Sequence, residues 1–373
     1  MKFRGSLTII LFLAMAAVYF AVAMSTRAQN SGDNSTATRQ RRADNIAEPS
    51  PTPPSKEEET LNSDDVLRVE TNLTNVFFTA ADKHKRFIST IKKEDVRILE
   101  DGVPQQIFTF QKNIDLPLSL AILIDTSRSE ERTLPDEKAA AQSFLESVMR
   151  QNRDEAAVVS FTGEATLEQG LTGNIARVRR AVSHVEYVPP AGLIGGGVVV
   201  GSTPPISDSQ QMLAGSTAIW DAVFTTSNEV LRDSAEHTRR AIILLTDGED
   251  TSSQVHIQSA IDAAVKVDAL IYAIGIGDRY SFGIDEGSLK KITGATGGRA
   301  YFPRNETELR SAFAQIQEDL REQYLIAYAS SNKTRDGSYR RVTIEITSSE
   351  LQTQSLKLTY RPGYFAKTPV TSP

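Results

Sequence analysis

Two aspartates that follow apolar runs have the clearest chemical potential in this chain. Asp125 comes directly after the run at 118–124 (LSLAILI), and Asp247 follows the run at 241–245 (AIILL) and one threonine. A short apolar run without alternation is typical of a strand buried on both faces of a parallel sheet. Parallel strands bring the residues that follow them to one edge of the sheet, where open α/β folds bind ligands. We therefore expect both carboxylates at that edge.

Hydroxyl groups accompany these aspartates. Ser127 and Ser129 alternate with Asp125 in DTSRS, and Thr217 stands at an expected helix start in GSTAIWD. Carboxylate and hydroxyl oxygens are hard ligands that Mg²⁺ accepts, directly or through water. Two carboxylates bring only two negative charges, so a further position around the ion would suit water or an incoming carboxylate. The sequence predicts a site for Mg²⁺, with Mn²⁺ or Ca²⁺ as alternatives, formed by Asp125, Ser127, Ser129, Thr217 and Asp247.

Several of these residues also have simpler possible roles. Ser127 and Ser129 could cap the following helix, and Asp247 with the next glycine could form only a turn. The metal site is the preferred interpretation because the three pieces occur together on strand and helix ends. Two further acids are left out of the metal shell. Asp221 is expected in the first turn of a helix, and Asp250 is expected to face solvent or to stabilise the next helix start.

The main enzymatic alternative is a Mg²⁺-dependent phosphatase that forms an aspartyl-phosphate at such a strand end. That chemistry requires a second acid, two residues after the nucleophile, as general acid and base. Ser127 occupies this position, and no lysine is placed beside Asp247 to balance a phosphoryl group. The chain also lacks a G-x-S-x-G elbow and a complete phosphate-binding glycine loop. A binding module is therefore expected rather than an enzyme, and a scaffold with a vestigial metal site is the third possibility.

Overall composition narrows the class of partner. The chain of 373 residues has a formal net charge of −6 and no basic stripe, which argues against nucleic acid. It contains no cysteine, so disulfides and thiolate metal sites are excluded. Its 4 histidines are scattered rather than paired at ligand spacing, which argues against a zinc site. These histidines are expected to be structural or exposed. Composition does not fix the oligomeric state.

Strands and helices alternate regularly around the two aspartates. Apolar strands are expected at 118–124, 156–161, 241–245 and 270–276, and helices at 135–149, 174–185, from about 217, 255–267, 286–293 and 306–321. Such alternation predicts an α/β fold with a doubly wound, mostly parallel sheet over 116–322. The flanks at 65–115 and 323–366 are typical of antiparallel strands, with a hairpin turn at Asp101-Gly102 that is expected to join a strand at 96–100 to the alternating segment at 106–111. Each flank is too small to bury a sheet face alone, so the two are expected to pair as a small β-rich domain.

The N-terminal segment has the features of an export signal. Lys2 and Arg4 precede an apolar stretch at 7–24, so residues 1–24 are predicted to be a cleaved signal peptide or an uncleaved membrane anchor. Residues 25–64 are rich in Ser, Thr, Asn and Pro, and are expected to form a disordered linker. The predicted location is extracytoplasmic, whether secreted, periplasmic or anchored at the cell surface.

Two other segments fall outside the regular pattern. A glycine-rich stretch at 189–215 is too long for an ordinary connection between a helix and the next element. It is expected to be either an insertion without a role or a loop that contacts a partner. Residues 367–373 form a short tail.

The combined motifs resemble those of a von Willebrand factor A domain with a metal-ion-dependent adhesion site. The matching pieces are DTSRS at 125–129, GSTAIWDAV at 215–223 and TDGED at 246–250. The stretch ILEDGVPQQIFTF and the closing YRPGYF also resemble a bacterial family of exported proteins related to this domain. The resemblance implies cation-dependent protein binding, in which an Asp or Glu of the partner completes the metal shell. Arg128 departs from the pattern, because a small residue often stands there; its charge could weaken ion binding or pair with an acidic partner.

Overall fold

The computed structural model describes residues 73–112, 115–127, 130–187, 216–235, 237–277 and 283–368. The predicted export segment, the linker and the glycine-rich stretch lie outside these residues, as do Arg128 and Ser129. Within the described ranges, no helix combines the length and the apolar character that a bilayer crossing requires.

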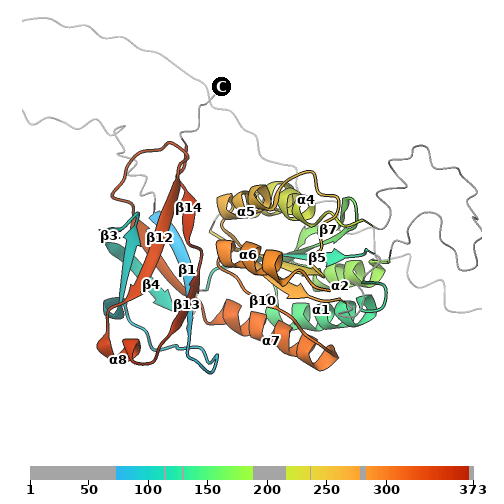
Figure 1. The fold of residues 1–373 in the computed structure, drawn as a ribbon, viewed down its shortest axis with the longest axis horizontal. Helices are drawn as coiled ribbons and strands as arrows, with labels where there is room; N and C mark the ends of the chain where they lie inside the picture. Colours follow the sequence, from blue (N-terminus) through green and yellow to red (C-terminus); the bar gives the residue numbers. More distant parts are fainter. Residues whose placement is uncertain are drawn as a thin grey trace, which may run out of the picture. The chain divides into compact units, whose positions relative to one another are not determined.

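A six-stranded sheet forms the centre of the α/β unit (Figure 1). Its strands, in the order in which they pair, are β10 (Ala300–Tyr301), β9 (Ala269–Gly275), β8 (Arg239–Thr246), β5 (Leu118–Asp125), β6 (Glu155–Phe161) and β7 (Ala165–Thr172). All neighbours pair in parallel except β7, which is antiparallel to β6. The sequence did not predict β7, because this edge strand is partly exposed and lacks the apolar run of a buried strand.

Helices cover both faces of this sheet. They are α1 (Leu134–Val148), α2 (Ile175–His184), α4 (Ile219–Thr225) with the π-helical segment η3 (Thr226–Leu231), α5 (Ile257–Lys266), α6 (Glu286–Thr296) and α7 (Glu306–Arg321). On one face, α1, α2 and α7 pack against the even-numbered residues of β5. On the other face, α4, α5 and α6 pack against Ala121 and Leu123. Because both faces are covered, all residues of β5 are buried, which explains its continuous apolar run.

The strand order reverses between β5 and β8. From β5 the chain moves outward through β6 and β7, and from β8 it moves the opposite way through β9 and β10. The helix after β5, α1, packs on one face of the sheet, whereas the helix after β8, α5, packs on the other. The loops after these two strands therefore diverge at the carboxyl edge, which is the place where doubly wound folds bind ligands. Asp125 and Asp247 both stand at this reversal point.

The flanks form two antiparallel sheets. One contains β13 (Lys357–Tyr360), β1 (Leu73–Ala81), β11 (Tyr324–Ala329) and β4 (Ile107–Lys112), and the other contains β14 (Gly363–Phe365), β12 (Tyr339–Ile346), β2 (Val96–Glu100) and β3 (Val103–Gln105). Two short helical turns, η1 (Lys93–Asp95) and α8 (Ser349–Gln352), complete the flanks. Each sheet joins a strand before the α/β unit to one after it, β1 with β11 and β2 with β12. The predicted α/β fold with a β-rich unit built from both flanks is thus confirmed.

The turn at Asp101-Gly102 is present, but the strand that follows it differs from the predicted one. Both residues have positive φ, 49° and 84°, as a tight hairpin turn requires. The turn joins β2 to the short β3, and the alternating segment at 107–112 then crosses to the other sheet, where β4 pairs with β11. The alternation of apolar and polar residues correctly predicted that this segment is a strand, but it did not predict that the strand pairs with β11.

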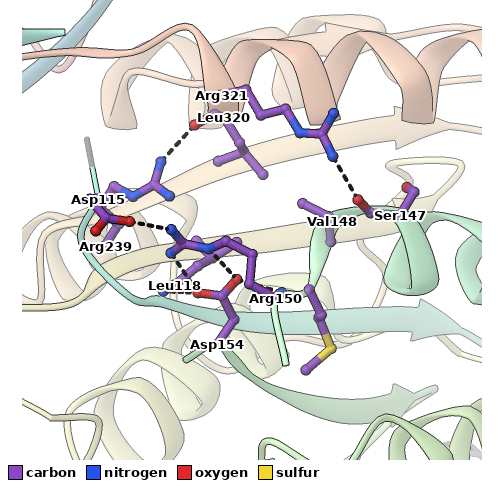
Figure 2. A pocket seen from close by; sticks show the side chains of 10 residues that line it. Asp115, Leu118, Ser147, Val148, Arg150, Asp154, Arg239, Leu320 and Arg321 are labelled. Atoms are coloured by element: carbon purple, nitrogen blue, oxygen red, sulfur yellow. Dashed lines mark hydrogen bonds and ion pairs between the residues drawn. The ribbon is translucent and has the colours of Figure 1, made fainter. Parts of the chain in front are cut away.

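Buried charge fixes the amino edge of the central sheet. Asp154, just before β6, accepts hydrogen bonds from the backbone nitrogens of Leu118 (2.9 Å) and Arg150 (2.7 Å) and from the Arg150 guanidinium (Figure 2). Burial raises the pKa of Asp154, but these hydrogen bonds outweigh it and hold the pKa below its ordinary value. A cavity of about 280 Å³ lies beside this network and is lined also by Arg239 and Arg321. The network ties the first residue of β5 to the end of α1.

We expect Asp154→Asn to lower the free energy of unfolding by about 1–3 kcal/mol, because the amide nitrogen that replaces one carboxylate oxygen can no longer accept the hydrogen bonds from the backbone nitrogen and Nε of Arg150. A carboxyl whose pKa is lowered by folding stabilises the protein above its unfolded-state pKa, and this contribution disappears as the pH falls through the folded-state pKa. Urea unfolding at neutral and at acidic pH measures both effects. Asp115→Asn is the control, because Asp115 also pairs with Arg150 (3.1 Å) but its side chain is 75% exposed. An equal loss in the two variants would contradict the prediction.

Candidate metal centre

Asp125 ends β5 and is fully buried. Its Oδ1 accepts a hydrogen bond from the backbone nitrogen of Ser127 (2.9 Å), which closes a tight turn directly after the strand. Its Oδ2 accepts a hydrogen bond from Oγ1 of Thr246 (2.6 Å), the last residue of the neighbouring strand β8. The carboxylate is therefore oriented from two strands at once. The sequence analysis missed the contribution of Thr246, because a threonine at the end of an apolar run has no distinctive signal.

Asp247 follows β8 and repeats the same local arrangement. Its Oδ1 accepts a hydrogen bond from the backbone nitrogen of Glu249 (2.9 Å), and the residue is only 3% exposed. Gly248 lies between them with a φ of +87°, and a Cβ at this position would come within 2.9 Å of Cγ of Leu289. Glycine is therefore required in this turn, both for its backbone conformation and for the close approach of α6.

The two aspartates converge with a third acid. Asp125, Asp247 and Glu130 each offer a carboxylate oxygen, and these oxygens all lie within 4.8 Å of one another. One cation can contact all three, because Mg²⁺ and Ca²⁺ bind oxygen at about 2.0–2.6 Å. The structure therefore brings together the two carboxylates of the predicted site and adds Glu130, which the sequence analysis did not include.

Glu130 belongs to a turn between β5 and α1. Its backbone nitrogen donates to the carbonyl of Ser127 (3.1 Å), and Oγ1 of Thr133 donates to its Oε2 (2.7 Å). The side chain is fully buried, as is that of Glu137 in the first turn of α1. Sequence reasoning gave no reason to select Glu130, because acids near a helix start are favourable there without any ligand. Its burial depends on the course of the turn.

The hydroxyl residues of the predicted site lie at the same edge where they are described. Ser127 is buried in the turn after β5 (2% exposed). Thr217 is held by its backbone nitrogen, which donates to Oγ1 of Thr251 (2.8 Å), and the residue after it donates to the carbonyl of Thr162 (2.6 Å). Thr217 is thus fixed between the loops that follow β6 and β8. Ser129 lies outside the described residues, so its predicted role stays a prediction.

Asp250 stabilises the start of α4, and Asp221 holds the loop that precedes α5. Asp250 Oδ1 accepts a hydrogen bond from the backbone nitrogen of Ile219 (2.8 Å), the first residue of α4. This corrects the expectation that Asp250 acts on the next helix, because α4 precedes it in the chain. Asp221, in the first turn of α4, accepts hydrogen bonds from the backbone nitrogens of Gln254 and Val255 (both 2.9 Å). The two acids therefore join α4 to the loop after β8.

Burial dominates the electrostatics of the acidic cluster. Burial, with a smaller contribution from the charge of Asp247, raises the pKa of Asp125 to about 7, although hydrogen bonds from Thr246 and Ser127 oppose this shift. Burial likewise raises the pKa of Glu130 well above its ordinary value and that of Glu137 to about 7. No lysine or arginine of the described residues forms an ion pair with these acids. Bound protons or a cation must therefore neutralise the negative charge of these buried acids.

The donor set fits a hard divalent cation. The acids of the cluster offer carboxylate oxygens, and Ser127 and Thr217 add hydroxyl groups at the same edge. Oxygen ligands of this kind suit Mg²⁺, Mn²⁺ and Ca²⁺, whereas structural zinc favours thiolate and imidazole. All four histidines are exposed, as the sequence analysis allowed, and they lie outside the cluster.

Family models match the unit that carries this cluster. A model of the von Willebrand factor type A domain matches residues 120–249, and a second model of the same domain matches residues 206–315. The chain is a von Willebrand factor type A (VWA) domain protein. The resemblance stated from the motifs is thereby confirmed for the central unit. The link to a bacterial family of exported proteins stays a prediction.

Solved structures are similar to this VWA protein at low sequence identity. A von Willebrand factor type A protein from Catenulispora acidiphila is 14% identical with a TM-score of 0.43, covering 81% of this chain and 76% of that one. The conserved hypothetical protein BatB from Bacteroides thetaiotaomicron is 16% identical with a TM-score of 0.40, covering 55% and 98%. Proximal thread matrix protein 1 from the mussel byssus, solved with a zinc-occupied MIDAS motif, is 18% identical with a TM-score of 0.44, covering 60% and 50%. The match thus spans about half of that mussel protein, and no curated protein matches the chain.

Proposed function

We propose that the VWA domain is a divalent-cation-dependent protein-binding module. Asp125, Ser127, Ser129, Thr217 and Asp247 hold one cation directly or through water at the carboxyl edge of the sheet. Mg²⁺ is the expected ion, with Mn²⁺ or Ca²⁺ as alternatives. An Asp or Glu side chain of a protein partner supplies a further oxygen ligand, so that the ion bridges two proteins.

The convergence of Asp125 and Asp247 carries this proposal. The two residues lie at the carboxyl ends of neighbouring strands, both are buried, and their carboxylates approach within 4.8 Å without a basic partner among the described residues. The charge of Asp247 adds to burial in disfavouring the ionised form of Asp125. A divalent cation would remove this conflict, and the site lies where the strand order reverses, which is where doubly wound folds bind ligands.

Binding is proposed rather than catalysis. An aspartyl-phosphate mechanism would need a second acid two residues after Asp125, and Ser127 stands there. Glu130 is a buried acid near Asp125, but its Oε2 is engaged by the hydroxyl of Thr133. Turnover of a generic aryl phosphate in Mg²⁺ is the direct check, and measurable turnover that Asp125→Asn removes would favour an enzyme.

An extracytoplasmic location is part of the proposal. It rests on the basic and apolar segment at 1–24, followed by the polar linker at 25–64. In an anchored protein, this linker would tether the VWA domain to the membrane; in a cleaved one, the domain would be released. N-terminal sequencing of the mature protein from fractionated cells distinguishes the two forms.

Chelation is expected to release a captured partner almost completely, because the bridge between the proteins is the ion itself. The immobilised protein is incubated with a cell-surface extract in Mg²⁺, washed, and eluted with EDTA. Proteins that elute from the wild type, and are absent from beads carrying Asp125→Asn, are the specific partners. Retention of these proteins in the presence of chelator would contradict a metal bridge.

A further inference from the structure

Glu130 lies outside the predicted metal shell, yet its surroundings are unusual for a glutamate. The side chain is fully buried, and one of its oxygens lies within 4.8 Å of those offered by Asp125 and Asp247. Oε2 accepts the hydroxyl of Thr133, whereas Oε1 is buried without a hydrogen-bond donor in the described part of the chain. A carboxylate oxygen that loses water and gains no donor destabilises the fold. A cation at the centre of the three carboxylates would supply the missing interaction.

Glu137, a buried neighbour of Glu130, does not provide this missing interaction. Glu137 is also fully buried, and neither of its carboxyl oxygens accepts a hydrogen bond from the described residues. A proton shared between Glu130 and Glu137 would satisfy part of this pair. It would still leave Asp125 and Asp247 beside each other with no positive charge from the described lysines and arginines. The cluster is therefore built around acids alone, as cation sites are.

The backbone holds Glu130 in place for such a role. The turn that follows β5 is closed by hydrogen bonds from the Glu130 nitrogen to the carbonyl of Ser127 and from the Thr133 nitrogen to the carbonyl of Glu130, both 3.1 Å. The hydroxyl of Thr133 then fixes Oε2 from the same turn. A side chain anchored at one oxygen can present the other to an ion with little loss of conformational freedom.

We propose that Glu130 is a direct ligand of the cation that Asp125 and Asp247 bind. This inference rests on the cation site of the proposed function and adds a ligand to it. Three carboxylates carry more negative charge than one divalent ion carries positive charge, so the protein retains the ion when no partner is present. A partner's carboxylate then adds less to the affinity for the ion than it would at a site with two protein carboxylates. Its main effect is to link the two proteins.

Two measurements on the full chain test this assignment. Titration calorimetry gives the Kd for Mn²⁺, and the luminescence lifetimes of bound Tb³⁺ in H₂O and D₂O give the number of water molecules on the ion. For Glu130→Ala, we expect the Kd to rise at least about tenfold and the ion to gain about one water in place of the lost carboxylate. Glu130→Gln keeps the size of the side chain and should weaken Mn²⁺ binding similarly, which secures the result if the alanine variant folds poorly.

Matched variants separate ligation from a structural role. Glu131 is the exposed neighbour of Glu130, so Glu131→Ala should keep the wild-type Kd and water number. Glu137→Gln should keep the wild-type water number, because Glu137 is not among the acids whose carboxylate oxygens converge. A weaker Kd for Glu130→Ala with an unchanged water number would overturn direct ligation.

Failure of this inference is distinguishable from failure of the proposed function. If Asp125→Asn abolishes Mn²⁺ binding while both Glu130 variants bind as the wild type does, the inference is wrong and the cation site stands. If the wild-type chain itself binds no Mn²⁺ or Tb³⁺, both are wrong. Circular dichroism of each variant confirms that the fold is retained.

Discussion

Asp125→Asn is expected to abolish Mg²⁺ binding and to leave the fold intact. Asparagine keeps the shape of the side chain and can still accept a hydrogen bond from Thr246 or from the Ser127 nitrogen. It removes one of the two predicted carboxylates, and hard divalent cations depend on such charged oxygen ligands. Calorimetric titration with Mg²⁺ measures the loss, and circular dichroism reports the fold. A wild-type affinity in this variant would contradict the assignment of Asp125.

The same substitution should change how the stability of the cation-free protein depends on pH. The pKa of Asp125 is raised to about 7 in the folded chain, so its carboxyl stabilises the fold at low pH and loses this contribution as the pH rises through that value. In EDTA, the melting temperature of the wild type should fall between acidic and mildly alkaline pH, and that of Asp125→Asn should fall less. Mg²⁺ at about 100 times its Kd should raise the free energy of unfolding of the wild type by about 2.7 kcal/mol and should leave that of the variant unchanged.

Asp233→Asn is the matched control for these experiments. Asp233 is exposed and precedes β8, at the edge of the sheet opposite to the acidic cluster. Its variant should bind Mg²⁺ with the wild-type affinity and show the same stabilisation by the ion. A loss of binding in Asp233→Asn as well would show that Mg²⁺ interacts with the overall negative charge of the chain rather than with the site.

The convergence of Asp125 and Asp247 could be predicted because it depends on topology rather than on local detail. Buried strands are visible as apolar runs, and parallel pairing places their ends at one edge. In the structure, Ile124 is in register with Leu245, so the residues that follow the two runs are neighbours. No side-chain conformation had to be known for this conclusion.

Glu130 could not be predicted for the opposite reason. Its burial depends on the turn between β5 and α1, which is held by hydrogen bonds to Ser127 and from Thr133. The orienting hydroxyl of Thr246 likewise depends on the rotamer at a strand end. In the flanks, alternation identified β4 as a strand, but it could not show that β4 leaves the hairpin to pair with β11. Periodicity specifies which residues are buried, whereas pairing depends on contacts between distant segments.

Glu100→Gln is expected to give the largest loss of stability outside the metal site, about 3–5 kcal/mol, because it leaves a buried arginine without its counter-ion. Glu100 ends β2, and its Oε1 pairs with Nη1 of Arg340 on β12 (3.2 Å), where the two side chains are 2% and 4% exposed. Its Oε2 accepts hydrogen bonds from the hydroxyls of Tyr328 (2.9 Å) and Tyr364 (2.8 Å). One carboxylate therefore connects both flank sheets. Urea unfolding measures the loss.

A second ion pair on the same two strands provides the control. Arg97 on β2 pairs with Glu345 on β12, and their side chains are 54% and 40% exposed. Exposed pairs contribute about 0–1 kcal/mol, so Glu345→Gln should leave the unfolding transition almost unchanged. Similar losses of unfolding free energy for Glu345→Gln and Glu100→Gln would show that stability depends on the charge of these ion pairs and not on their burial.

Removing both partners of the buried pair tests whether the ion pair itself carries the effect. In the double variant Glu100→Gln with Arg340→Met, no uncompensated charge remains, and buried ion pairs replaced by uncharged residues are often tolerated. Most of the lost stability should therefore return. If it does not, the hydroxyls of Tyr328 and Tyr364, which still lack a charged acceptor, hold the two flank sheets together. In either case the Kd for Mg²⁺ should stay at the wild-type value, because Glu100 lies in the flank sheets and is not among the acids of the metal centre.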